Sequence, residues 1–251
     1  MSRKKGSTID DFIYIIGWLG YWLTYLLIIL CIVIIRIIMF IVSMILFYTS
    51  SYKKKTGYGF FKTYFNKGYY GEYKLYRKIR KIIDQECIVL NTYLPSMAKN
   101  VDDTEIDIIA ISNKHIYCFE MKNYKGKIYG YRDQYQWSQY TNYRHQYKFY
   151  NPLRQNEGHV SAIENYLCIE NNNIVPIVVF SNKADISNVR AAGVLKMREI
   201  GKYLKEYEGT ERDIFSNAQV EKYINKLKEC ANASYDVKMN HVADVRELKK
   251  R

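Results

Sequence analysis

The sequence lacks the cysteine and histidine patterns that build common zinc and disulfide sites. It holds five cysteines, an odd number, and no two of them form a CxxC pair, so neither a zinc ribbon nor a disulfide framework is expected. The four histidines form no HExxH motif, which argues against a zinc peptidase. The free thiols fit a reducing compartment. The residues concerned are Cys31, Cys87, Cys118, Cys168, Cys230, His115, His145, His159 and His241.

Acidic residues and proline are also in short supply. Lys and Arg number 38 against 25 Asp and Glu, which gives a formal net charge of +13. A balance of this kind favours anionic partners, either nucleic acid or an anionic membrane surface. The alternative is simple solubility, or a codon bias toward Lys, Ile, Asn and Tyr. The 3 prolines and 26 tyrosines support that second explanation.

Charge is absent from a long N-terminal run. Residues 12–49 are almost entirely apolar, and the 24 residues from Phe12 to Ile35 carry no charge. A helix of that length is about 36 Å long, enough to cross the hydrocarbon core of a bilayer. The run is too long for the core of a signal peptide and has no clear small-residue cleavage site. We therefore predict a membrane anchor over residues 1–49.

Arg36 leaves two arrangements of this anchor open. Near the end of a single span, its side chain reaches the membrane interface. A hairpin of two spans would have a short second half and no polar turn, so we favour one span. Basic residues are more numerous after the anchor than before it, which places the following domain in the cytoplasm, at the cell membrane. Those after it are Lys53, Lys54, Lys55, Lys62 and Lys67.

Residues 50–67 form a basic, aromatic connector. Between residues 51 and 81, eight Lys and two Arg accompany a single acidic residue, Glu72. One interpretation is a segment that lies on anionic lipid, with Tyr and Phe at the interface. The other is a nucleic-acid contact surface. We favour lipid for residues 51–67, because they follow the anchor directly, and leave DNA open for Lys74 to Lys81.

Periodicity predicts an α/β fold for the rest of the chain. Apolar residues recur at helical spacing in some segments, while others are short apolar runs bounded by turn residues. Helices followed by a hairpin, a further helix and a buried strand indicate an α/β sandwich. The expected helices are 69–84, 151–169, 196–207 and 217–231, and the expected strands are 87–93, 104–112, 115–123, 125–131 and 173–181.

Glu72 stands out in the first of these helices. Leu75, Ile79 and Ile83 belong to its apolar stripe, and Glu72 lies three residues before Leu75 on the same side. An ionised carboxylate on a buried stripe needs a partner. Alternatively, Glu72 belongs to the first turn, where the helix dipole favours an acidic residue. The pattern alone leaves both explanations open.

Three charged residues interrupt the apolar hairpin "EIDIIAISNKHIYCFEMKN", residues 105–123. Side chains alternate along a strand, so Glu120 and Lys122 share one face, and the turn brings Asp107 beside them. Two carboxylates this close repel each other unless a cation separates them. Carboxylate oxygens with open positions suit Mg²⁺, which takes substrate phosphate and water as further ligands. A structural salt-bridge cluster is the alternative.

These segments together resemble a known family. Asp107 followed by Glu120-Met121-Lys122 is similar to the D…ExK signature of the PD-(D/E)XK nuclease superfamily. More narrowly, residues 68–183 resemble its nuclease-related domain, NERD, through "GEYKLY", "EIDIIAI", "YCFEMKNYKGKIYG", Trp137 and "NPLRQNEGHV" in this order. Residues 184–251 lie outside the resemblance, and we expect them to form a C-terminal helical extension.

The resemblance implies a fold, a cofactor and a set of site residues. The fold would be a restriction-endonuclease-like mixed sheet flanked by helices. Asp107, Glu120 and the backbone carbonyl of Met121 would hold Mg²⁺ or Mn²⁺, and Lys122 would be the catalytic lysine. Glu72 would hold a metal-bound water. Gln155 would position the substrate or the lysine.

Three functions follow as alternatives. The first is a membrane-anchored nuclease that hydrolyses DNA phosphodiester bonds at the cytoplasmic face, with RNA left open as a substrate. The second is a catalytically silent, membrane-tethered module that binds nucleic acid or protein on the same fold. The third is a structural anchor in which the charged residues form only a salt-bridge network. The complete Asp107, Glu120 and Lys122 set favours the nuclease, while the oligomeric state is left open.

Overall fold

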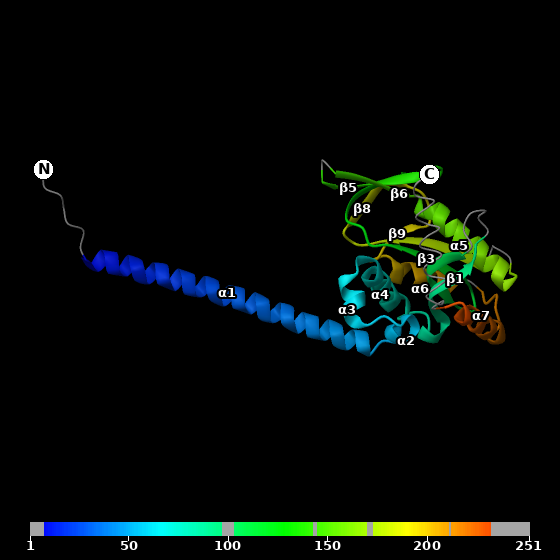
Figure 1. Ribbon diagram of the computed structural model, residues 1–251, viewed down its shortest axis with the longest axis horizontal. Helices are drawn as coiled ribbons and strands as arrows, with labels where there is room; N and C mark the ends of the chain where they lie inside the picture. Colours follow the sequence, from blue (N-terminus) through cyan, green and yellow to red (C-terminus); the bar gives the residue numbers. More distant parts are fainter. Residues whose placement is uncertain (1–7, 97–102, 143–144, 170–172, 211, 232–251) are drawn as a thin grey trace. The chain divides into compact units, whose positions relative to one another are not determined.

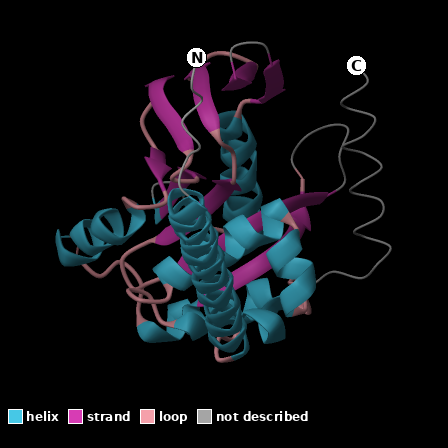
Figure 2. Ribbon diagram, turned by 90° about the vertical axis from the view of Figure 1, so that its left-hand side faces the viewer, coloured by secondary structure: helices cyan, strands magenta, loops and turns pink. Residues whose placement is uncertain are grey.

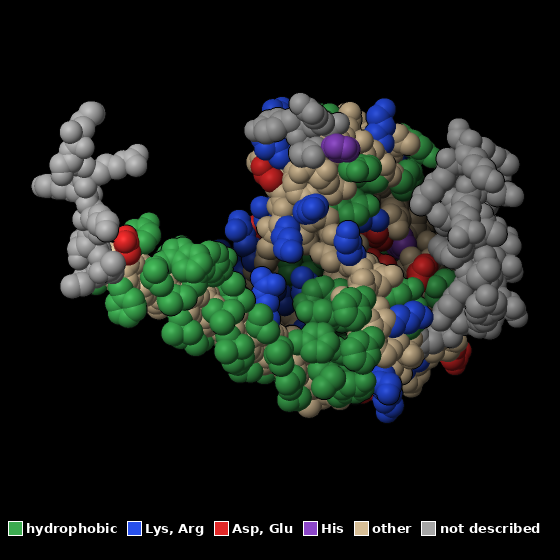
Figure 3. All heavy atoms as spheres, turned by 60° about the vertical axis from the view of Figure 1, so that its left-hand side comes forward, with side chains coloured by type: hydrophobic (Ala, Val, Ile, Leu, Met, Phe, Trp, Pro, Cys, Tyr) green, Lys and Arg blue, Asp and Glu red, His purple; other side chains and the backbone are tan. Residues whose placement is uncertain are grey.

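The computed structural model describes residues 8–96, 103–142, 145–169, 173–210 and 212–231. The chain divides into two compact units, residues 1–50 and 51–251. In the first, α1 (Thr8–Tyr48) is one continuous helix, and Asp11–Tyr48 is long and apolar enough to cross a membrane. The helix is unbroken at Arg36, which agrees with one span rather than a hairpin. Its visible side is covered by hydrophobic side chains (Figure 3).

The predicted connector is folded rather than extended. It forms α2 (Tyr52–Thr56) and α3 (Phe60–Phe65), and α4 (Lys67–Ile79) follows directly. Tyr52 and Phe60 are buried, since their rings pack within the second unit. The Lys55 Nζ donates a hydrogen bond of 3.0 Å to the carbonyl oxygen of Ile88. Residues 52–65 therefore belong structurally to the domain that follows them.

The main sheet has five strands in the order β1-β2-β3-β7-β9 (Figure 1). The first three are antiparallel neighbours, whereas β7 lies parallel to β3 and β9 lies parallel to β7. The sheet is thus mixed, as expected. The strands are β1 (Ile88–Pro95), β2 (Asp103–Ile111), β3 (Ile116–Lys122), β7 (Ile174–Phe180) and β9 (Val194–Lys196).

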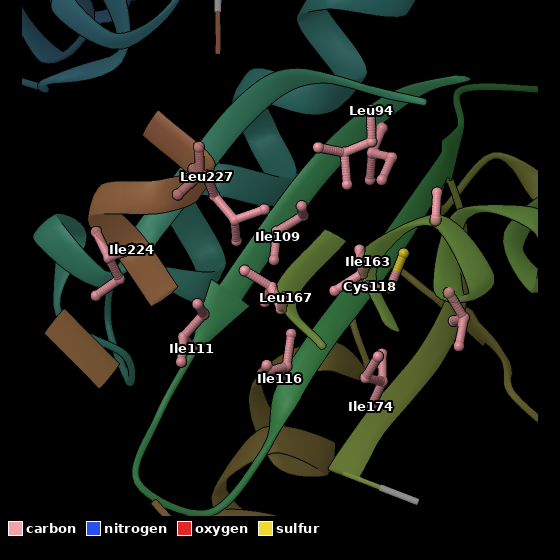
Figure 4. Close-up of a cluster of buried hydrophobic side chains, with 14 of the residues drawn as sticks. Leu94, Ile109, Ile111, Ile116, Cys118, Ile163, Leu167, Ile174, Ile224 and Leu227 are labelled. Atoms are coloured by element: carbon pink, nitrogen blue, oxygen red, sulfur yellow. The ribbon is translucent and has the colours of Figure 1, made fainter. Parts of the chain in front are cut away.

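Both faces of this sheet are covered. Ile109, Ile116 and Cys118 pack in one cluster with residues of α5 (Pro152–Leu167) and α7 (Asn217–Glu229), as Figure 4 shows. The alternate residues of β2 and β3 are also fully buried, so a second layer lies on the other face. There α4 contacts β2, β3 and α6 (Ile200–Thr210).

A smaller second sheet has the order β6-β5-β4-β8 (Figures 1 and 2). It packs on the first through a cluster that includes Ile128, Trp137 and Phe180. A Cβ on Gly130 would stand 2.1 Å from the Trp137 ring, so only glycine fits beneath that indole. The strands are β4 (Gly126–Tyr131), β5 (Gln136–Asn142), β6 (His145–Tyr150) and β8 (Ala184–Arg190).

The structure corrects three expectations. The first predicted helix ends at Ile79 instead of residue 84, and Asp84 caps a short 3-10 turn, Gln85–Cys87, before β1. The strand expected at 125–131 forms as β4, but it belongs to the second sheet and does not extend the hairpin of β2 and β3; it begins at Gly126, which has a φ of 80°.

The third correction concerns the C-terminal extension expected over residues 184–251. It begins with β8 and β9, and its helices start only at Ile200. These strands escaped prediction because β8 is a polar edge strand with little apolar alternation, and β9 has only three residues. Residues 232–251 of the predicted extension lie outside the described residues.

Candidate active site

The β2–β3 hairpin brings the two expected carboxylates together. Ile108 pairs with Phe119 in the antiparallel register, so Asp107 and Glu120 occupy the next positions along the two strands. The Met121 N–H donates a hydrogen bond of 2.8 Å to Asp107 Oδ2. This bond fixes the Asp107 carboxylate against the β3 backbone at Met121, the residue that follows Glu120.

Lys122 is held by two partners at the end of β3. Its Nζ lies 2.5 Å from Glu120 Oε1 in an ion pair and donates a hydrogen bond of 3.0 Å to Gln155 Oε1. Glu120 is buried, with 2% of its surface exposed. The expected residues Asp107, Glu120, Lys122 and Gln155 are therefore neighbours in the structure.

The helix α5 supplies Gln155 and a residue that sequence reasoning did not assign to the site. His159 Nε2 lies 3.6 Å from Glu120 Oε2. Because His159 follows Gln155 by four residues on one helix, the two side chains share a face. That spacing was the available signal. Asn156 fixes the helix in place by donating a 3.1 Å hydrogen bond to the carbonyl oxygen of Cys118.

The start of α5 is well determined by its sequence. Pro152 occupies the first turn, where its missing N–H costs nothing, and the Asn151 side chain caps the helix by accepting a hydrogen bond from the Leu153 N–H. Val160 and Ile163 belong to its buried apolar stripe. This arrangement turns Gln155 and His159 toward the end of β3.

Glu72 approaches the carboxylates from α4. The helix begins at Lys67 and has no acidic residue in its first turn, which excludes the helix-dipole explanation for Glu72. Gly71 permits a close approach, since a Cβ there would stand 2.8 Å from the Asn123 Cβ. Asn123 in turn donates a hydrogen bond of 2.6 Å to the carbonyl oxygen of Lys67. The helix is thus docked on the chain immediately after Lys122.

Burial and mutual repulsion dominate the electrostatics of these acids. Burial raises the pKa of Glu72 to about 8, repulsion from Glu105 and Glu120 adds to the rise, and a hydrogen bond from Tyr52 opposes it. Tyr52 and Glu105 were not foreseen as neighbours of Glu72. Like charges also surround Asp107.

The pKa of Asp107 is raised well above its ordinary value. Burial is the main cause, and Glu120 and Glu72 contribute by repulsion, while the Met121 N–H and Lys122 act in the opposite direction. Burial alone would lower the pKa of Lys122, but Glu120, Tyr124 and Asp107 outweigh it and raise the value. The site therefore holds a firmly charged ammonium and acids that need further positive charge.

The donor set fits a hard divalent cation. Glu120 Oε2 is buried and accepts no hydrogen bond from any residue that the structure describes. Asp107 and Glu120 would supply two carboxylates, a number that suits Mg²⁺ when phosphate and water complete its shell. Across the described ranges, no three His, Cys, Asp or Glu side chains are arranged to hold a metal.

Comparison with known proteins agrees with the motif in the hairpin. An uncharacterized protein of Bacillus anthracis is 26% identical over 180 residues, which are 70% of this chain and 82% of that protein. No solved structure matches the chain. Residues 67–181 match the family model of the nuclease-related domain, close to the range 68–183 expected from the motifs. The chain thus carries a nuclease-related domain, NERD, over residues 67–181.

Proposed function

We propose that this chain is a metal-dependent nuclease that hydrolyses DNA phosphodiester bonds, anchored in the cell membrane with its folded domain in the cytoplasm. One observation carries the proposal: Asp107, Glu120 and Lys122 meet at the end of β3, inside a nuclease-related domain. The cofactor that best suits these ligands is Mg²⁺, with Mn²⁺ as an alternative.

Asp107 and Glu120 would hold the cation, and the Met121 carbonyl is the proposed third ligand. A bound divalent cation supplies activation of water and stabilises the charge that develops on the phosphate. Glu72 would hold and orient the attacking water; burial and repulsion from Glu105 and Glu120 raise the pKa of its carboxyl group in the metal-free chain.

Lys122 serves the substrate. Its ammonium lies 2.5 Å from Glu120 Oε1, which would leave Glu120 Oε2 for the cation. Lys122 would donate to a phosphate oxygen or orient the water. Gln155 accepts a hydrogen bond from Nζ and holds the ammonium at the end of β3.

The surroundings favour an anionic polymer. Lys and Arg side chains are spread over the visible face of the folded domain (Figure 3). Such a surface attracts phosphate backbones. The positive-inside rule supports a cytoplasmic position for the folded domain, because basic residues are more numerous after α1 than before it.

A second candidate is a silent binding module on the same fold. The observation in its favour is the Lys122–Glu120 ion pair, which satisfies one carboxylate oxygen without a metal. In that case nucleic acid binding would not depend on Asp107 and would weaken steeply with salt.

The test uses the full-length chain in detergent micelles. Plasmid, linear and single-stranded DNA and single-stranded RNA are incubated with Mg²⁺, Mn²⁺ or EDTA. We expect cleavage with metal only, and a loss of about 10²–10³-fold in Asp107→Asn and Lys122→Ala. Lys222→Ala, an exposed lysine on α7, is the matched control and should cleave normally. Unchanged cleavage in the two site variants would refute the assignment, and binding without any cleavage would favour the silent module.

A further inference from the structure

The outer face of the second sheet is not used by the proposed chemistry. Along β4, Ile128 and Gly130 point inward and are buried, while Lys127, Tyr129 and Tyr131 point outward and are exposed. The inward side packs on Trp137 and the first sheet. The outward side chains therefore form a face of their own.

Strand register extends this face across the whole sheet. Lys127 pairs with Tyr140 on β5, and Tyr131 pairs with Arg190 on β8. Residues paired in this way point to the same side. Ser138, opposite Tyr129, connects the face to β6, where it pairs with Lys148. We define the platform by these outward residues: Lys127, Tyr129, Tyr131, Tyr140, Lys148 and Arg190.

The platform combines exposed rings with positive charge. Tyr129 is 40% exposed and Tyr131 48% exposed, although each also has an aromatic or cationic neighbour. The Tyr129 and Tyr140 rings lie 5.2 Å apart, and the Arg190 guanidinium lies 5.9 Å from the Tyr131 ring. The three cations are accompanied by one carboxylate on this face, Asp185 opposite Lys127.

Resting on the proposed nuclease function, we infer that the platform binds single-stranded nucleic acid. Exposed tyrosine rings stack on bases, and Lys and Arg between them neutralise phosphates. Bases in a duplex hide their faces, so the rings select unpaired segments. The exposed large hydrophobic residues of this sheet are all tyrosines, whereas an apolar lipid or protein partner would be matched by aliphatic side chains.

The chain segment that forms β4, β5 and β6 lies in the sequence between two elements of the candidate active site. The strand β4 begins four residues after Lys122, and α5, which carries Gln155, begins directly after β6. Two short connections, residues 123–125 and Asn151, therefore join the sheet that carries the platform to the elements that carry Lys122 and Gln155. A platform that binds single strands would give the proposed nuclease a preference for single-stranded or frayed substrates.

The test measures binding apart from cleavage. The full-length chain in detergent micelles carries Asp107→Asn, EDTA is present, and fluorescein-labelled single-stranded DNA and the matching duplex are titrated by anisotropy. We expect tighter binding of the single strand, and at least a tenfold loss in the double variant Tyr129→Ala, Tyr131→Ala. Phenylalanine at both positions keeps the stacking surface and should restore binding. Lys127→Ala should lower the salt dependence by about 0.7 in its logarithmic slope.

Tyr147→Ala is the matched control. Tyr147 is an exposed tyrosine of the same sheet, but it pairs with Gln139 and so points to the opposite side from Tyr129. Equal losses in this control and in the platform variant, or equal binding of duplex and single strand, would overturn the inference. Tyrosine-dependent binding without cleavage in the parent chain would sustain the platform while refuting the nuclease. Cleavage without tyrosine-dependent binding would support the nuclease and refute the platform.

Discussion

Replacing Glu72 with glutamine should stabilise the metal-free protein, increasingly so as the pH rises. The pKa of Glu72 is raised from 4.5 to about 8 in the folded chain, first by burial and then by repulsion from Glu105 and Glu120. Between these two values the folded chain binds more protons than the unfolded chain. Its free energy of unfolding therefore falls as the pH rises through that window. Glutamine is uncharged, like the protonated acid, so the Glu72→Gln variant should not lose stability in this way as the pH rises.

The size of the effect follows from the shift. Each pKa unit corresponds to about 1.4 kcal/mol, so the raised pKa of Glu72 sets an upper limit of about 5 kcal/mol above pH 8. Glu72 is half-buried, and water and structural relaxation screen part of the repulsion. We therefore expect the advantage of Glu72→Gln over the parent to grow by about 2 kcal/mol between pH 5 and pH 9.

Urea unfolding in EDTA measures this difference. The chain has 3 tryptophans, and Trp137 is fully buried in the folded domain. In a Trp18→Phe, Trp22→Phe background, Trp137 fluorescence reports on that domain alone. Glu221→Gln, an exposed acid on α7, serves as the control and should follow the parent at every pH. If the free energy of unfolding has the same pH dependence in the parent and in Glu72→Gln, then the pKa of Glu72 is not raised by burial and neighbouring acids.

Three further results are expected. Lys122→Met leaves the buried Glu120 without its ion-pair partner and should cost about 3–5 kcal/mol in urea unfolding with EDTA, whereas a loss below 1 kcal/mol would contradict a buried pair. Mg²⁺ should raise the melting temperature of the parent by mass action but not that of Asp107→Asn, and equal shifts would argue against a cation at Asp107. Gly130→Ala should destabilise the domain by about 1–3 kcal/mol, because its methyl group would overlap the Trp137 ring, and a neutral result in calorimetry would contradict that packing.

The parts of the fold that could be predicted are those with strong local patterns. The hairpin of β2 and β3 has apolar strands around a short polar turn, and its period of two correctly placed Asp107 beside Glu120. The helix α5 has a proline at its start and a clear apolar stripe. In each case burial, turn chemistry and periodicity indicate the same structure.

The second sheet was harder to predict because its strands look polar. Along β6, every residue but Phe149 is exposed, and the inward-facing residues of β5 are marked by little more than Trp137. Parallel pairing of β4 with β8 joins segments far apart in the chain, and no local pattern encodes such a pairing. The neighbours of Glu72 in the candidate site were missed for the same reason, since Tyr52 and Glu105 meet Glu72 only through tertiary packing.

The parallel pairing of β3 with β7 also determines when the site is completed during folding. The hairpin that carries Asp107, Glu120 and Lys122 is local and can form quickly. Its next neighbour in the sheet, β7, follows the whole of β4, β5, β6 and α5 along the chain. Pairing β7 with β3 closes a long loop, and the entropic cost of closure precedes the contacts that stabilise the pair. We therefore expect this pairing to be slow. A nascent chain that has not yet added Ile174 therefore lacks the strand that pairs with β3, and the candidate site is completed only after most of the domain has been synthesised.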